Sequence, residues 1–159
     1  IKQEIDNGFD VNFDDGLPLR AAAKIGNLDI VRYIVENGGD MTRKEGMALQ
    51  WASEYGHVNV VKYLVVDKQL KTGLAKATEY LFRRLDVREK ENKKDLEEYN
   101  KSDKQRKEMY KKKLDEYDVI RPGYVGCVKL LMDALKTNSP TDYTRFLEMI
   151  KKNGYTYLN

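Results

Sequence analysis

Few side chains of this sequence could act directly in chemistry, and each of them stands alone. The 159 residues include one histidine, His57, one cysteine, Cys127, and one tryptophan, Trp51. A histidine can act as a general base or a metal ligand, and a cysteine thiolate can act as a nucleophile. One residue of each kind does not supply the ligands of a usual zinc site. A single cysteine cannot form an internal disulfide, so we expect an intracellular protein.

Other catalytic signals are also missing from the sequence. The acidic pairs Asp14-Asp15 and Glu97-Glu98 lie in an expected turn and an expected solvated helix. There is no Gly-rich phosphate loop, no nucleophile elbow and no His-Glu metal motif. We therefore predict a protein that is not an enzyme, with no catalytic residue, cofactor or metal site.

Charge and hydropathy exclude further classes. The net charge of +3 comes from 29 basic and 26 acidic residues, and such a mixture gives no basic face for nucleic acid. No window approaches the ~18 to 20 apolar residues that a membrane span requires.

The elements that position these residues repeat at an offset of 30 positions. Each unit contains two predicted helices, 17–25 then 28–36 in one and 47–55 then 58–66 in the next. The second helix of a unit has an apolar face, and one helix pair cannot bury that face alone. Stacked units would supply the core. The identities carried by the offset pair Gly8, Asp10, Gly16, Leu19, Ala22, Gly26, Val31 and Tyr33 with Gly38, Asp40, Gly46, Leu49, Ala52, Gly56, Val61 and Tyr63.

The run DDGLPLRAAAKIGNLDIVRYIVENGGDM resembles the ankyrin repeat, with its Gly, Pro-Leu pair, paired Ala, Gly, Ile-Val helix and closing Asn-Gly. The resemblance covers residues 1–67. The family's Thr before Pro-Leu and His after it are replaced by Leu17 and Arg20, then by Met47 and Gln50. The period is also shorter than the usual ~33 residues. Both departures are similar to ankyrin arrays of giant DNA viruses, which would imply a location in the host cytoplasm or the virion.

The two ends of the repeat region differ from a regular array. Residues 1–8 align with residues 31–38, so we expect the chain to begin inside a repeat, with an N-terminal truncation. Residues 123–131 match residues 56–64 at a spacing of 67, not 30. We therefore predict repeats over 1–72 and a third repeat over 73–136, into which about 37 residues are inserted.

The insert, roughly residues 83–118, has 13 basic and 11 acidic residues and no Gly or Pro. This composition predicts a helical hairpin, one helix ending near residue 99 and the other spanning about 102–118. Its turn would carry a capping box from Ser102 to Gln105. One long solvated helix is the alternative, because the expected apolar seam is sparse. That seam would contain Leu85, Leu96, Tyr99, Tyr110, Leu114 and Tyr117.

The segment 137–159 is predicted to hold a capping helix over 139–153 and a tail. Ser139 followed by Pro140 is typical of a helix start, and an end helix with a polar outer face would close a solenoid. Three residues get structural interpretations: His57 orders a turn, Trp51 is partly core, and Cys127 is a packed thiol.

The predicted fold is thus an all-α ankyrin-repeat solenoid with a charged helical-hairpin insertion and a C-terminal capping helix. The resemblance implies a non-enzymatic scaffold whose turn tips and first helices bind a protein partner. An alternative is a structural component of a larger assembly such as a virion, joined through the insert, or an adaptor module of a longer protein. Carried over by position, the partner-binding residues are Phe13, Asp14, Lys24, Ile25, Arg43, Lys44, Glu45, Glu54 and Tyr55.

Overall fold

The chain folds into helices. The computed structural model describes residues 1–155, except that only the backbone of Gln105 is described. This part of the chain contains no strand. The prediction of an all-α protein is confirmed. In chain order the elements are α1 (Lys2–Asp6), α2 (Phe13–Ile25), α3 (Leu28–Glu36), α4 (Arg43–Glu54), α5 (Val58–Lys62), the π-helical turn η1 (Tyr63–Asp67), α6 (Leu74–Lys101), α7 (Lys104–Asn138) and α8 (Pro140–Asn153).

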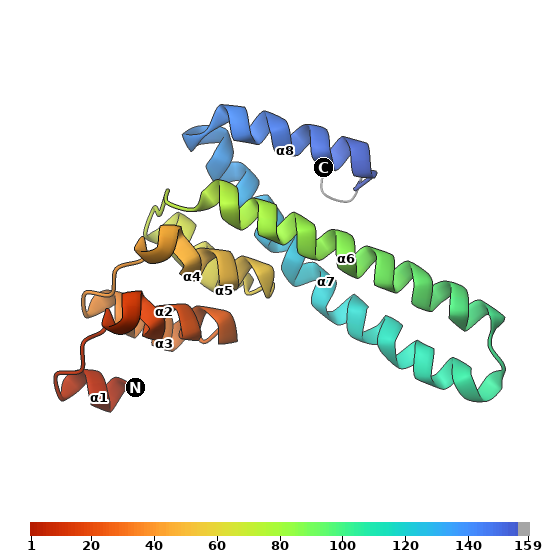
Figure 1. The fold of residues 1–159 in the computed structure, drawn as a ribbon, viewed down its shortest axis with the longest axis horizontal. Helices are drawn as coiled ribbons and strands as arrows, with labels where there is room; N and C mark the ends of the chain where they lie inside the picture. The colour runs from red at the N-terminus through yellow and green to blue at the C-terminus, as the bar shows by residue number, and fades with distance from the viewer. Residues whose placement is uncertain (156–159) are drawn as a thin grey trace.

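The helices form two layers at one end of the molecule and a long projection at the other (Figure 1). In the inner layer, α2 packs against α4 and α4 packs against α6. In the outer layer, α3 contacts α5 and α5 contacts α7. Each inner helix is followed by its outer partner, except that the beginning of α6 and the end of α7 are separated by the projection.

Small residues and helix caps explain why the units stack so closely. Ala22, Ala23 and Ala52 are buried in the inner layer, where a larger side chain would push neighbouring helices apart. Gly26 ends α2 in the left-handed conformation with φ of 79°, which is least costly for glycine. The Asn27 side chain then caps α3 by accepting a 3.1 Å hydrogen bond from the Ile30 amide.

The turns that precede the inner helices are unusual because non-glycine residues adopt left-handed backbone angles there. Asp14 and Asp15 have φ of 47° and 54°, and Lys44 and Glu45 have φ of 51° and 57°. A non-glycine residue in this conformation destabilises the folded state by roughly 1–3 kcal/mol, and the conformation persists only where the surrounding structure holds it. Regular helical geometry therefore begins after Gly16 and Gly46, as the predicted starts at residues 17 and 47 require.

Two of the four residues that depart from the ankyrin pattern hold these turns. The Arg20 guanidinium donates from Nη2 to the carbonyl oxygen of Asp14 at 2.8 Å. In the next unit the Gln50 amide donates from Nε2 to the carbonyl oxygen of Glu45, also at 2.8 Å. Both side chains are buried. Arg20 and Gln50 thus satisfy turn carbonyls from the position where the family has histidine.

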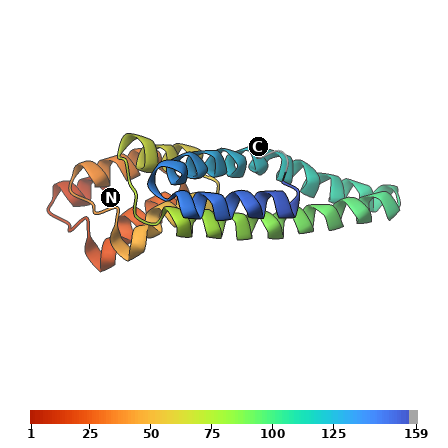
Figure 2. The ribbon, with the colours of Figure 1, turned by 90° about the horizontal axis from the view of Figure 1, so that it is seen from above.

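The projection, here called the arm, is made of the C-terminal part of α6 and the N-terminal part of α7. The two helices lie side by side and are joined at Ser102 and Asp103 (Figures 1 and 2). Ion pairs link the helices, Arg121 to Glu89 at 3.7 Å and Lys113 to Asp95 at 3.3 Å. Because the insert is built from two helices, the alternative of one long solvated helix is wrong. No residue between 86 and 116 whose side chain is described is buried.

Two details of the arm differ from the sequence expectation. The expected boundaries between insert and repeat helices do not exist, because α6 and α7 each continue without a break from arm to stack, with Pro122 inside α7. The predicted cap at Ser102 is wrong. Asp103 accepts the hydrogen bond from the Arg106 amide at 3.0 Å, whereas the Ser102 hydroxyl donates to the Glu98 carbonyl at 2.6 Å. The predicted role of the Gln105 side chain lies outside the described residues.

Helix α8 lies over the beginning of α6 and the end of α7 (Figure 1). The Phe146 ring stacks on Phe82 with centroids 5.7 Å apart, and the Tyr155 ring also stacks on Phe82 with centroids 6.3 Å apart. Burial, with the nearby Asp86 carboxylate, raises the pKa of Tyr155 to about 12. Residues 156–159 of the predicted tail lie outside the described residues.

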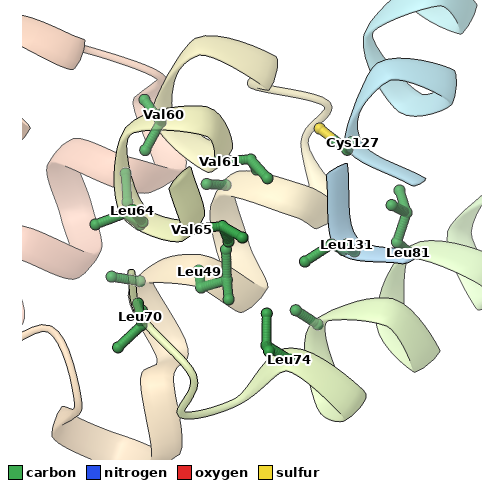
Figure 3. Packing of buried hydrophobic residues seen from close by; sticks show 14 of the residues in the cluster. Leu49, Val60, Val61, Leu64, Val65, Leu70, Leu74, Leu81, Cys127 and Leu131 are labelled. Carbon is green, nitrogen blue, oxygen red and sulfur yellow. The ribbon is translucent and has the colours of Figure 1, made fainter. Parts of the chain in front are cut away.

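One continuous hydrophobic core joins the stack to the base of the arm. Figure 3 shows Leu49 and Val61 of the repeats close to Leu81 of α6 and Leu131 of α7. Cys127 lies in this core with no exposed surface, and burial raises the pKa of its thiol to about 12. This is the packed, unreactive thiol that its alignment with Val60 indicates.

Candidate partner-binding surface

The structure separates the predicted partner-binding residues into two groups. One group lies on the turns before the inner helices, and the other lies at the C-terminal ends of α2 and α4. All nine are exposed except Glu54, which is half-buried. The turn group contains Phe13, Asp14, Arg43, Lys44 and Glu45, and the helix-end group contains Lys24, Ile25, Glu54 and Tyr55.

The charged turn residues are paired across neighbouring units. Lys44 contacts Asp15 at 3.0 Å, and Arg43 contacts both Asp15 at 3.7 Å and Asp40 at 3.2 Å. Glu45 pairs in the same way with Lys76 of α6. The Lys44 hydrogen bond, more than any other interaction, lowers the pKa of Asp15 below its usual 3.8.

These cross-unit ion pairs give the turn charges a structural role as well as an exposed position. Pairs at the surface contribute little individually, typically ~0–1 kcal/mol, but several of them connect successive turns. Asp15 and Lys76 were not among the predicted residues. Their participation follows from stacking, which places a turn beside the turn of the next unit.

Phe13 and Ile25 lie at the N-terminal edge of the described stack. Arg43, which is the counterpart of Phe13 in the next unit, packs over Gly16. Phe13 instead contacts Phe9, with ring centroids 5.7 Å apart, and remains 54% exposed. Ile25 is 74% exposed, whereas its counterpart Tyr55 is 42% exposed. Phe13 and Ile25 therefore lie at the border of the candidate surface.

At the centre of the inner layer, basic and aromatic residues of α2 and α4 form one cluster. The Lys24 ammonium lies 5.4 Å from the ring centre of Trp51 and 5.5 Å from that of Tyr55. The Arg20 guanidinium lies 5.6 Å from Trp51. These four residues are called the cation–aromatic cluster below. Trp51 is half-buried, but it is not among the hydrophobic residues that form the core or pack against it, so its predicted partial place in the core is not supported.

Sequence reasoning included Lys24 and Tyr55 but missed Arg20 and Trp51 as parts of this surface. A signal was present, because residues three or four positions apart share one face of a helix. Arg20 with Lys24 on α2, and Trp51 with Tyr55 on α4, have that spacing. What the sequence did not show is that these two faces meet.

His57 holds the turn next to this cluster. Its Nε2 atom lies 2.8 Å from the carbonyl oxygen of Lys24, and its ring is stacked with Tyr55 at a centroid distance of 6.4 Å. The ring also occupies the space above Gly26, where an added Cβ would lie 2.4 Å from Nδ1. The contacts are those of a residue that orders a turn, as predicted for His57.

Another concave surface lies between the two arm helices. This open groove of about 950 Å³ is lined mostly by charged side chains of both signs, among them Arg88, Glu91, Asp95 and Lys113. Among the described residues, no three His, Cys, Asp or Glu side chains are grouped so that they could hold a metal ion. Over the same part of the chain, no helix combines the length and the apolar character needed to cross a membrane.

The two-layered stack of helix pairs defines a helical-repeat solenoid. Comparison with protein families agrees: residues 1–74 match the model of ankyrin repeats, in three copies. That match ends at the first residue of α6, so it covers the stack and not the arm. Neither a curated protein nor a solved structure matches the chain. Ankyrin repeats are generally protein–protein interaction modules.

Proposed function

We propose that this chain is a non-enzymatic scaffold that binds a protein partner through its inner layer. The observation that carries the proposal is the cation–aromatic cluster of the ankyrin repeats, in which Lys24 and Tyr55 are exposed. Tyrosine, tryptophan and arginine are the residues most enriched where proteins bind one another tightly. The proposal keeps the nine predicted residues as the contact surface, with the largest contribution from Lys24 and Tyr55.

The proposal assigns the arm to the repeat array as an enlarged third unit, residues 73–136 with the insert at about 83–118. Gly73 supports it, because its φ of 81° matches the left-handed Gly46 at the start of α4. Gly123 supports it too, since an added Cβ would lie 2.6 Å from the carbonyl oxygen of Gly56. Helix α8, within residues 137–159, would close the core as a capping helix.

A second function is favoured by the exposed apolar residues of the arm. Met109 is 53% exposed and Val119 is 79% exposed, on a projection that little else covers. A structural component of a larger assembly, such as a virion, would bury them between neighbours, and an adaptor in a longer protein would present them to another domain. In each case the location would be intracellular, in the host cytoplasm or the virion for a viral protein.

The test compares two substitutions of similar exposure in the two regions. With the chain as bait in extracts of its native source, Tyr55→Ala is expected to lose the captured partner, whereas Met109→Ala is expected to retain it. Loss with Met109→Ala alone would move the binding site to the arm. Thermal unfolding of both variants controls for folding, and neither should differ much from the original chain because both side chains are substantially exposed.

A third variant tests the arm as a whole. Replacing residues 91–116 with a short Gly/Ser linker removes the distal arm but keeps the buried residues Leu85 and Tyr117. The scaffold proposal expects this shortened chain to fold and to capture the same partner. Failure to capture by a folded, shortened chain would support the assembly alternative.

A further inference from the structure

We infer that the cation–aromatic cluster recognises an extended, acidic segment of the partner protein, with a carboxylate at Lys24 and apolar side chains against Trp51 and Tyr55. This inference rests on the proposed function and specifies the chemistry of the partner.

Lys24 is an oriented cation without an ion-pair partner among the described residues. Its ammonium is held over two aromatic rings, and no carboxylate of the described residues forms an ion pair with it. The side chain is exposed. An incoming carboxylate would therefore form a charge-assisted hydrogen bond without first breaking an ion pair.

The turn cations offer a contrast within the same molecule. Lys44 and Arg43 already contact Asp15, and Lys76 already contacts Glu45. A carboxylate ligand would have to compete with these carboxylates. Arg20 of the cluster also lies 4.0 Å from the Asp14 carboxylate, so Lys24 is the cation of the cluster at which an acidic ligand gains most.

The third inner helix carries a second cation–aromatic pair, with both residues on the same helix. Tyr80 of α6 is exposed, and the Arg83 guanidinium lies 5.6 Å from the centre of its ring. Arg83 also forms an ion pair with Glu79 at 3.5 Å, so part of its positive charge is already neutralised. Packed helices lie about 8–10 Å apart, and an extended chain advances about 3.3 Å per residue. A segment crossing from α4 to α6 would therefore present acidic side chains at intervals of about three residues.

One acidic residue of the surface opposes this ligand and gives the inference a second test. Glu54 precedes Tyr55 at the end of α4 and is half-buried. Its carboxylate would repel an acidic segment bound at Lys24. Neutralising it with Glu54→Gln is expected to strengthen binding of an acidic segment and to leave an uncharged one unaffected.

Trp51 permits a direct measurement, because it is the one tryptophan of the chain. We would titrate the intact protein with a synthetic peptide that repeats Asp-Leu-Ser and follow tryptophan fluorescence. Matched peptides have Asn or Lys in place of Asp. The Asp peptide is expected to change the emission saturably, with weaker binding at higher salt, and the other two are expected to have little effect.

Variants then locate the contact. Lys24→Gln is expected to weaken binding of the Asp peptide by about tenfold, the value of one charge-assisted hydrogen bond. Lys24→Arg, which keeps the charge, is expected to retain most of the binding. Lys62→Gln is the matched control, because Lys62 is exposed on α5 in the outer layer and its loss is expected to have no effect.

Three results would overturn the inference: equal binding of the Asp and Asn peptides, equal effects of Lys24→Gln and Lys62→Gln, or an emission change with polyuridylate RNA but not with the Asp peptide. Its failure can be distinguished from failure of the proposed function. If Tyr55→Ala abolishes partner capture while the Asp peptide does not bind, the inner layer still holds the partner, but through other chemistry.

Discussion

The repeat stack and the arm are both helical, yet different interactions hold them together. In the stack, each inner helix places at least one leucine in the core with almost no exposed surface, as Leu19, Leu49 and Leu81 illustrate. In the arm, no described side chain between residues 86 and 116 is buried, and cross-helix ion pairs join the two helices. Apolar burial stabilises the first region, whereas the second depends on helix propensity and exposed contacts.

Because of this difference, the stack can hold side chains in fixed positions, whereas the arm extends away from the stack with little support. A surface that must recognise a partner needs neighbours that hold its side chains in place, and the helices that carry the cation–aromatic cluster also contribute Leu19, Ala23 and Ala52 to the buried core. The arm extends far beyond the stack (Figure 1) but rests on few contacts. Regions with few buried apolar contacts open locally at low free-energy cost.

The largest effect we predict concerns thiol reactivity in the two regions. Cys127 is fully buried and its pKa is raised to about 12, so the reactive thiolate is scarce until the core opens. A cysteine placed in the arm by Lys112→Cys is expected to react with a maleimide more than about a hundredfold faster than Cys127. Stopped-flow or mass-spectrometric labelling measures both rates. Comparable rates would mean that the end of α7 is not part of the core.

Leucine truncation should show the same contrast in stability. Leu49→Ala leaves a cavity in the core and is expected to lower the free energy of unfolding by roughly 2–5 kcal/mol. Leu96→Ala in the arm, where the side chain is 46% exposed, is expected to cost less than about 1 kcal/mol. Urea unfolding followed by circular dichroism checks both values. Similar losses would remove the distinction between the two regions.

Glycine substitution tests how closely the units must approach. Gly73→Ala puts a Cβ 2.4 Å from the carbonyl oxygen of Glu45 at a residue with φ of 81°, and it is expected to cost more than about 2 kcal/mol. Gly154→Ala is the matched control, since φ is 71° but nothing lies within 4 Å of the added Cβ. It is expected to cost about 1 kcal/mol. Equal losses would show that the approach of the turns contributes nothing.

The smallest effect is expected from the cross-unit ion pairs. The folded chain lowers the pKa of Asp15, so this carboxylate stabilises the folded state above its unfolded-state pKa of 3.8. That contribution is lost as the pH falls through the folded-state pKa. Asp15→Asn should therefore show a slightly smaller loss of stability on acidification than the original chain. Asp133→Asn, an exposed site on α7, is the control and should leave the acid response unchanged.

Much of the stack could be predicted from the sequence, because its units repeat and their signals are local. Helix α3 has the predicted bounds, Leu28–Glu36, since Gly26 and Asn27 mark its start and Asn37 with Gly38 marks its end. The ends of α6 and α7 could not be predicted in the same way. Good helix formers continue from arm to stack, so no local signal separates insert from repeat.

The candidate surface was predicted only in part because it depends on contacts between units. Single positions such as Tyr55 follow from the repeat pattern. The meeting of Lys24 with Trp51, and of Lys44 with Asp15, depends on the offset between stacked helices, which the period alone does not specify. Arg20 and Gln50 illustrate a third case, in which chemically different residues satisfy turn carbonyls from equivalent positions.

The most direct test of the central claim is site-specific photocrosslinking. Benzoylphenylalanine would replace Tyr55 in one sample and Met109 in another, and both proteins would be irradiated in extracts of the native source. The account predicts a discrete crosslinked partner from position 55 and none from position 109. A partner crosslinked from position 109 alone would contradict it and assign binding to the arm.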